Sequence, residues 1–136
     1  MKIDDLTLGL RTSREFLLRH LKEMPAEAWD SRLAGTPRSV REIVEHLLEE
    51  DSEWIVLLGG EKLSLHASPE SLRASNEALL ELLQRQWADR ADEAFLILTG
   101  DGKGMPQGVT YRQIEDYYHS GQIAWLRLAL QPGWEL

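Results

Sequence analysis

The chain has 136 residues, of which 43% are hydrophobic and 28% are charged, so it can bury a core and is not a mainly disordered chain. Its formal net charge of −8, with Lys and Arg scattered singly, argues against binding to nucleic acid or to an anionic membrane surface. The sequence has no cysteine, which excludes disulfides, thiolate nucleophiles and Cys-ligated zinc.

The sequence shows neither the apolar core of a signal peptide near Met1 nor an apolar run of membrane-spanning length. We therefore expect a cytoplasmic protein that does not enter a membrane. The length is that of one ordinary domain, and we expect residues 1–136 to form a single domain.

Apolar residues first repeat with helical spacing from about Asp4 to Glu23, and Pro25 ends this segment. Residues 25–37 read as a connecting loop. The second helix has a clear start, because Ser39 and Glu42 form the pattern of a capping box, in which each side chain binds the backbone of the other. The pair Gly59-Gly60 ends this helix.

The third predicted helix begins at Ser68-Pro69, an N-cap followed by a proline at the first helical position, and runs to about Arg90. The last helix opens with a second capping box, formed by Thr110 and Gln113, and runs to about residue 130.

One segment between the third and last helices favours another structure. The run Phe95–Leu98 is prone to form a strand, and residues 99–104 are rich in turn-forming glycine. With residues 108–110 it predicts a short β-hairpin or an irregular crossover.

Four helices of about 20 residues in a chain of this length predict an all-α fold, a four-helix bundle. The loop between the first two helices and the link before the last helix are each long enough for a crossover connection.

The candidate chemistry lies on the last helix. Glu115 and His119 are four residues apart, so their side chains project from the same face, and that face continues into Gln122 and the apolar Ile123 and Leu126. Polar groups buried in this way need partners, because leaving them unpaired costs several kcal/mol. A divalent cation is one such partner, since imidazole and carboxylate are good ligands for zinc-like ions.

A third ligand is available on the second helix. His46 lies at the edge of its apolar face, and Glu49 and Glu50 follow within reach as supporting partners or a spare ligand. Three protein ligands would leave one coordination position for water or substrate, which is typical of a catalytic site.

Another interpretation stays open at this point. A histidine at the edge of a helix is commonly a hydrogen-bonded or surface residue, and Glu115 could pair with Arg112 instead of a metal. The chain would then be a non-catalytic, metal-free dimeric bundle with a stress-related or small-molecule-binding role. We expect His20 and His66 to be exposed to solvent.

Two segments resemble a known family. Residues 118–127, with the sequence YHSGQIAWLR, resemble the His-x-Gly-Gln-Ile…Leu-Arg signature of the DinB/YfiT-like metalloenzymes. Residues 39–47, SVREIVEHL, resemble the helix that carries the first histidine of that family. The order of the elements fits over essentially the whole chain.

The resemblance implies a helical bundle with a long crossover, usually a homodimer, that holds a divalent metal on three histidines. It places His46 as the first ligand and His119 as the third. The chain departs from the family at Glu115, where the middle histidine is expected. A His-Glu-His set can still bind zinc, nickel or ferrous iron, although the change could also mark a member that has lost its metal.

Some members of the family are S-transferases that use small thiols. The resemblance therefore implies a metal-dependent transferase or hydrolase, with Gln122 available to orient a ligand. Apolar residues near the end of the last helix, Trp125 and Leu128 together with Trp134, suggest a surface for a homodimer.

Overall fold

The computed structural model describes residues 1–33, 35–100 and 108–136. These residues form five α-helices and one short 3₁₀ helix, and no strand occurs among them. In chain order the elements are α1 (Ile3–Leu21), η1 (Ala26–Ala28), α2 (Val40–Leu57), α3 (Pro69–Gln86), α4 (Ala91–Leu98) and α5 (Tyr111–Leu130). The all-α prediction is confirmed for the described residues. Over the same residues, no helix is both long enough and apolar enough to cross a membrane.

The helix starts follow the predicted local chemistry. Ser39 and Glu42 form a capping box at the start of α2, and Thr110 and Gln113 form the second one at the start of α5. The hydroxyl of Ser68 accepts a hydrogen bond at the start of α3, directly before Pro69. These caps satisfy backbone N–H groups that have no partner within the helix.

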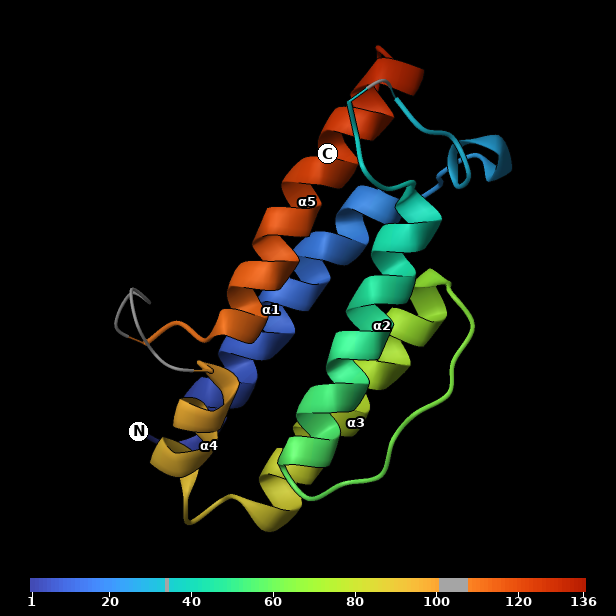
Figure 1. The fold of residues 1–136 in the computed structure, drawn as a ribbon. Coiled ribbons are helices and arrows are strands. Elements are labelled where there is room, and N and C mark those ends of the chain that lie inside the picture. The colour runs from blue at the N-terminus through green and yellow to red at the C-terminus, as the bar shows by residue number, and fades with distance from the viewer. Residues whose placement is uncertain (34, 101–107) are drawn as a thin grey trace.

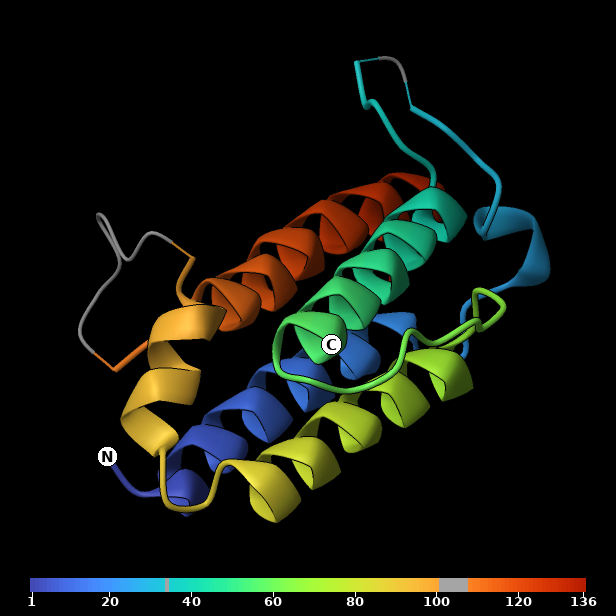
Figure 2. The same ribbon diagram turned by 60° about the horizontal axis from the view of Figure 1, so that its bottom comes forward.

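The long helices α1, α2, α3 and α5 lie side by side as a bundle (Figures 1 and 2). Helix α1 packs mainly against α3 and α5, and α2 packs against the same two helices, so α1 and α2 occupy diagonal positions. Helices α1 and α5 run in one direction, whereas α2 and α3 run in the other (Figure 1).

The crossover connection is residues 58–68, which run back along the bundle so that α3 can start beside the start of α2 (Figure 1). Both predicted positions of the crossover, before α2 and before α5, were therefore wrong. Gly59, with φ of +93°, begins this connection in a conformation that glycine adopts without strain.

The predicted β-hairpin needs correction. Phe95–Leu98 form the second half of α4 rather than a strand, and the eight residues of α4 add a fifth helix to the four expected. A run of four apolar residues does not itself distinguish a strand from a buried helix, and here Ala94 and Leu98 are buried on one helical face. The turn predicted for the glycine-rich part of this link lies largely outside the described residues.

The interior has two apolar clusters separated along the bundle by a layer of polar residues. One cluster lies toward α4 and includes Leu10, Ile55, Leu79 and Leu98. The other lies toward the opposite end and includes Leu17, Val44, Leu72 and Ile123. The polar layer between them consists of Ser13, Arg14, Asp51, Ser75, Asn76, Arg112 and Asp116, all buried.

Candidate metal centre

The three predicted ligands converge between α2 and α5. His46 comes from α2, and Glu115 and His119 come from consecutive turns of α5. One ligand atom from each residue lies within 4.8 Å of the other two, so this group could hold a metal ion. His119 is 2% exposed and Glu115 9% exposed, whereas His46 is half-buried at the mouth of the site.

The distances between the ligand atoms suit a small cation. Oε2 of Glu115 lies 3.0 Å from Nε2 of His119 and 3.7 Å from Nε2 of His46. Ligand atoms at the corners of a tetrahedron around zinc, with bonds of about 2.0 Å, are about 3.3 Å apart. The two pairs that include Glu115 thus fit such an ion with shifts of a few tenths of an ångström, whereas the ligand atoms of His46 and His119, which lie within 4.8 Å of each other, would need the larger approach.

The other ring nitrogen of His119 faces Gln122. Its Nδ1 donates to Oε1 of Gln122 at 2.6 Å, and Nε2 of that amide donates to the hydroxyl of Tyr118 at 3.3 Å. This contact orients the imidazole so that Nε2 faces Glu115. Metal-binding histidines usually donate their second N–H in this way, which fixes the ring and its tautomer.

Glu50 and Glu49 occupy different environments. Oε1 of Glu50 lies 3.2 Å from Nε2 of His46, while its Oε2 is buried and has no hydrogen-bond partner among the described residues. Glu49 is exposed and lines a separate surface hollow beside Ser52 and Lys62. Of the two predicted supporting glutamates, only Glu50 therefore belongs to the cluster, and its unpaired oxygen is the sort of atom that a cation or its bound water would satisfy.

The surroundings shift the pKa values of the two carboxyl groups of the cluster, Glu115 and Glu50, in opposite directions. The hydrogen bond from His119, with a smaller contribution from Tyr111, lowers the pKa of Glu115 to about 2. Burial, together with the negative charge of Glu115, raises the pKa of Glu50 to about 7. A hydrogen bond with Glu115 raises the pKa of Tyr111 to about 12. Glu115 is thus ionised at neutral pH, as a metal ligand must be.

The imidazole of His46 is kept in its neutral form. Burial lowers its pKa first, and the nearby positive charge of Arg38 lowers it further. A neutral imidazole has a lone pair to offer a cation, so the surroundings of His46 favour the state in which it can bind a metal.

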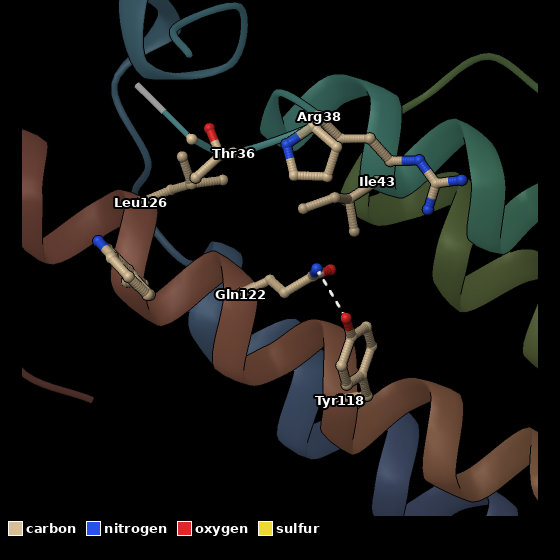
Figure 3. Close-up of a pocket in the computed structure, with 9 residues that line it drawn as sticks. Thr36, Arg38, Ile43, Tyr118, Gln122 and Leu126 are labelled. Carbon is tan, nitrogen blue, oxygen red and sulfur yellow. Dashed lines mark hydrogen bonds between the residues drawn. The ribbon is translucent and has the colours of Figure 1, made fainter. Parts of the chain in front are cut away.

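A pocket of about 340 Å³ opens between α5 and the segment that leads into α2 (Figure 3). One wall consists of Tyr118, Gln122 and Leu126, which lie on α5. The facing wall consists of Ile43 on α2 and the segment before that helix, which includes Arg38. Gln122 is shared, because it lines the pocket and also bonds to His119. A ligand in the pocket would therefore be one side chain, Gln122, away from His119, and none of the three metal-binding candidates itself lines the pocket.

Arg112 does not form the ion pair with Glu115 that was considered as an alternative to metal binding. Its guanidinium donates to Asp51 at 2.9 Å, to Asn76 at 2.7 Å and to Asp116, and not to Glu115. Arg14 completes this buried group by donating to Asp51 at 2.8 Å and to Asp116 at 3.2 Å. Although burial alone would lower it, these two aspartates raise the pKa of Arg14 above its ordinary value.

Sequence reasoning missed Tyr111, Arg38 and the buried charge network. Tyr111 had a signal, because it precedes Glu115 by four residues and so shares its helix face. Asp51 had one as well, since it interrupts the apolar stripe of α2 between Leu48 and Ile55. Arg38 lies in a loop, where no periodicity indicates its neighbours.

His20 also departs from expectation. It is 5% exposed rather than solvent-exposed, its Nδ1 lies 2.8 Å from the carbonyl oxygen of Phe16, and its ring lies against Trp134. Burial lowers its pKa. His66 is exposed, as expected.

No protein-family model, curated protein or solved structure matched this chain. The resemblance to the DinB/YfiT-like family therefore stays an expectation. The functional argument depends on the geometry of the residues described above.

Proposed function

We propose that the protein is a divalent-metal-dependent enzyme whose ion is held between α2 and α5 by His46, Glu115 and His119. The observation that carries this proposal is the meeting of two imidazoles and one ionised carboxylate within 4.8 Å, from two separate helices. Such an ion lowers the pKa of a water or thiol that it binds and so supplies a nucleophile at neutral pH.

Three features of the chain's own residues support an enzymatic role. Gln122 orients His119, Glu50 has one carboxyl oxygen beside His46 and a second that is buried without a hydrogen-bond partner among the described residues, and a pocket shares Gln122 with the cluster. A purely structural metal site is usually closed by four protein ligands, whereas three ligands beside a pocket leave a position for a substrate atom. Transfer of a thiol, or hydrolysis, is the reaction class that we propose.

Borderline cations suit this donor set best. Two imidazole nitrogens with one carboxylate oxygen are ligands for zinc, nickel or ferrous iron, whereas calcium and magnesium prefer sites made of oxygen alone. We propose zinc or nickel as the resident ion, with iron as the further choice.

We also propose that the protein forms a homodimer through the exposed side of α5. Trp125 is 69% exposed and Leu128 is 45% exposed, which leaves apolar surface that one bundle does not cover. Trp134, the third residue of the predicted surface, is half-buried and packs against His20 and Arg127 of its own chain. Light scattering of the purified protein tests this assembly.

One observation favours a metal-free, non-catalytic bundle as the second candidate. Both ring nitrogens of His119 already face protein oxygens, at 3.0 Å from Glu115 and 2.6 Å from Gln122, so a ring that carries a proton on each nitrogen would be satisfied without an ion. The buried Oε2 of Glu50 argues the other way, because in the ionised carboxylate it meets no hydrogen-bond donor among the residues that the structure describes.

Elemental analysis separates these candidates. Protein grown with zinc, nickel or iron and then dialysed is expected to retain one ion per chain. The double variant His46→Ala, His119→Ala is expected to retain none, and the matched control His66→Ala, which changes an exposed histidine, is expected to match wild type. Wild type without bound metal would eliminate the enzyme as proposed, and metal that persists in the double variant would show that the ligands are different residues.

A further inference from the structure

Among the described residues that line the pocket beside the candidate metal centre, Arg38 is the one that is charged, and none is acidic. The remaining lining is Gly35, Thr36, Pro37, Ile43, Tyr118, Gln122, Trp125 and Leu126. The chain as a whole has a formal net charge of −8, so a cavity with only positive charge in its wall stands apart from the rest of the surface. Charge of one sign around a cavity selects ligands of the opposite sign.

Arg38 is also unlike the other arginines of the same segment. Arg32 pairs with Glu42, and Arg41 donates to Asp30 at 2.7 Å. Arg38 makes no ion pair or hydrogen bond with any of the described residues. It is half-buried, and Figure 3 shows its side chain extending past Ile43 toward α2. A guanidinium placed in this way can bind a carboxylate with two parallel hydrogen bonds.

The opposite part of the pocket is apolar. Trp125 and Leu126 lie on α5, and Ile43 faces them from α2. The indole of Trp125 is largely uncovered. A ligand with a flat or branched hydrocarbon body would cover these side chains and remove apolar surface from water, which stabilises the complex by about 25 cal/mol for each Å² that is buried.

Gln122 connects the pocket wall to His119, because it lines the pocket and also accepts a hydrogen bond from that imidazole. The pocket and the candidate metal centre therefore share this residue.

We propose that this pocket binds a small organic carboxylate with an apolar body, the carboxylate pairing with Arg38 and the body lying against Trp125, Leu126 and Ile43. As a statement about the substrate class it rests on the proposed function, because the pocket opens at the same site. Recognition of the anion needs no metal, so it can be tested separately.

The test compares phenylacetate with phenylacetamide, which has the same shape and no charge. Binding to metal-free, EDTA-treated protein is followed by tryptophan fluorescence and by calorimetry. Wild type is expected to bind phenylacetate about tenfold more tightly, because a hydrogen bond to a charged group contributes about 1.5 kcal/mol or more. Arg38→Gln is expected to remove that preference while leaving phenylacetamide binding within about twofold, since only the charged contact is lost.

Two further variants serve as controls. Arg41→Gln removes a surface arginine that is outside the pocket lining and is expected to leave the preference unchanged. Trp125→Ala removes an apolar lining side chain that is 69% exposed in the single chain, and it is expected to weaken both probes alike. Equal binding of the two probes, no binding of phenylacetate at millimolar concentration, or an equal loss in Arg38→Gln and Arg41→Gln would overturn the proposal.

Repeating the titration with zinc separates this inference from the proposed function. If the protein binds no metal but still prefers phenylacetate, the proposed enzyme fails and the anion pocket stands. If it binds zinc and shows no preference between the probes, the metal centre stands and the anion pocket fails.

Discussion

The imidazole rings of His46 and His119 lie edge to face between α2 and α5, with their centroids 5.2 Å apart and their planes inclined at 72°. The two helices run in opposite directions (Figure 1), so the His46–Glu50 pair of one meets the Glu115–His119 pair of the other. Each pair has the four-residue spacing that puts two side chains on one helix face. Two rings and two carboxyl groups thereby gather at one level of the bundle, and the first predictions concern this group.

Glu115→Gln should weaken zinc binding by more than about tenfold. Substitution of residues that only hydrogen-bond to a metal ligand commonly costs about tenfold in affinity, and loss of a ligand itself should cost more. The neutral amide oxygen is a poorer ligand than the ionised carboxylate of Glu115, whose pKa is lowered to about 2. Competition with a fluorescent zinc chelator measures the affinity. Glu49→Gln, which changes an exposed neighbour of Glu50, should bind zinc like wild type. Unchanged affinity in Glu115→Gln would remove this residue from the ligand set.

Bound zinc should be released as the pH falls, because protons compete with the metal for the imidazole nitrogens. Burial lowers the pKa of His46, so protonation of its ring needs a lower pH than the ordinary histidine value of 6.5. Release is therefore expected between about pH 6 and pH 5 and not near neutrality. Dialysis at stepped pH followed by elemental analysis checks the profile, and a flat profile across this range would argue against imidazole ligands.

In metal-free protein, Glu50 should reduce stability as the pH rises. Its pKa is raised from 4.5 to about 7 in the folded chain, so between these values the folded state holds a proton that the unfolded state has lost. The stabilisation is complete below about pH 4.5 and is lost as the pH rises through about 7. The thermal midpoint of wild type should therefore fall relative to that of Glu50→Gln between about pH 5 and pH 8.

The comparison with Glu50→Gln isolates this residue from His46. The lowered pKa of His46 acts in the opposite direction, because stability is lost as the pH falls through 6.5, where the unfolded histidine gains a proton. Both proteins contain His46, so its effect is common to the two curves. Midpoints that change in parallel across the whole range would show that Glu50 ionises normally in the folded protein.

Asp116→Asn should lower the free energy of unfolding by about 3 kcal/mol or more, because it leaves two buried guanidinium groups with one aspartate between them. Asp116 is fully buried and accepts hydrogen bonds from Ser13 at 2.8 Å and from Arg14 at 3.2 Å. Urea denaturation gives the value. Asp92→Asn breaks a contact with the N-terminal amine at a side chain that is 80% exposed, and it should cost less than about 1 kcal/mol. Similar losses in both variants would contradict the structural role of the buried network.

Two glycine substitutions should have opposite effects. A Cβ on Gly60 would lie 2.7 Å from Cγ2 of Ile55 and 3.2 Å from its carbonyl oxygen, so Gly60→Ala should destabilise the fold by about 1–3 kcal/mol. Gly121 is exposed in α5 and has nothing within 4 Å of such an atom, so Gly121→Ala should stabilise by up to about 1 kcal/mol through helix propensity. Thermal midpoints of the two variants test the signs, and a gain at Gly60 would contradict the close packing there.

The parts of the structure set by local chemistry could be predicted from the sequence. Both capping boxes were found, because the Ser39–Glu42 and Thr110–Gln113 pairs need only the three-residue spacing of the first helical turn. The pairing of Glu115 with His119 on one face followed from helical geometry in the same way. His46 could be chosen as the third ligand only from its place at the edge of the apolar face of α2, since spacing alone does not say which helices are neighbours.

The features that were missed depend on contacts between segments far apart in the chain. Phe95–Leu98 has no local signal that favours helix over strand, and the packing of Leu98 against the cluster containing Leu10 is available only in the folded chain. The charge network joins Arg14, Asp51 and Asp116 from three helices, so no single segment reveals it. The crossover position was missed because helix order in space cannot be read from loop lengths alone.

The diagonal placement of α1 and α2 has a consequence for how the chain acquires its structure. Consecutive helices that pack together can form a hairpin early, but α1 finds its main neighbours in α3 and α5, which follow much later in the sequence. Large loops must therefore close before the first helix is covered, and folding should be slower than for helical proteins with mostly local contacts. During synthesis on the ribosome, the apolar side of α1 is fully covered only after α5 has been made.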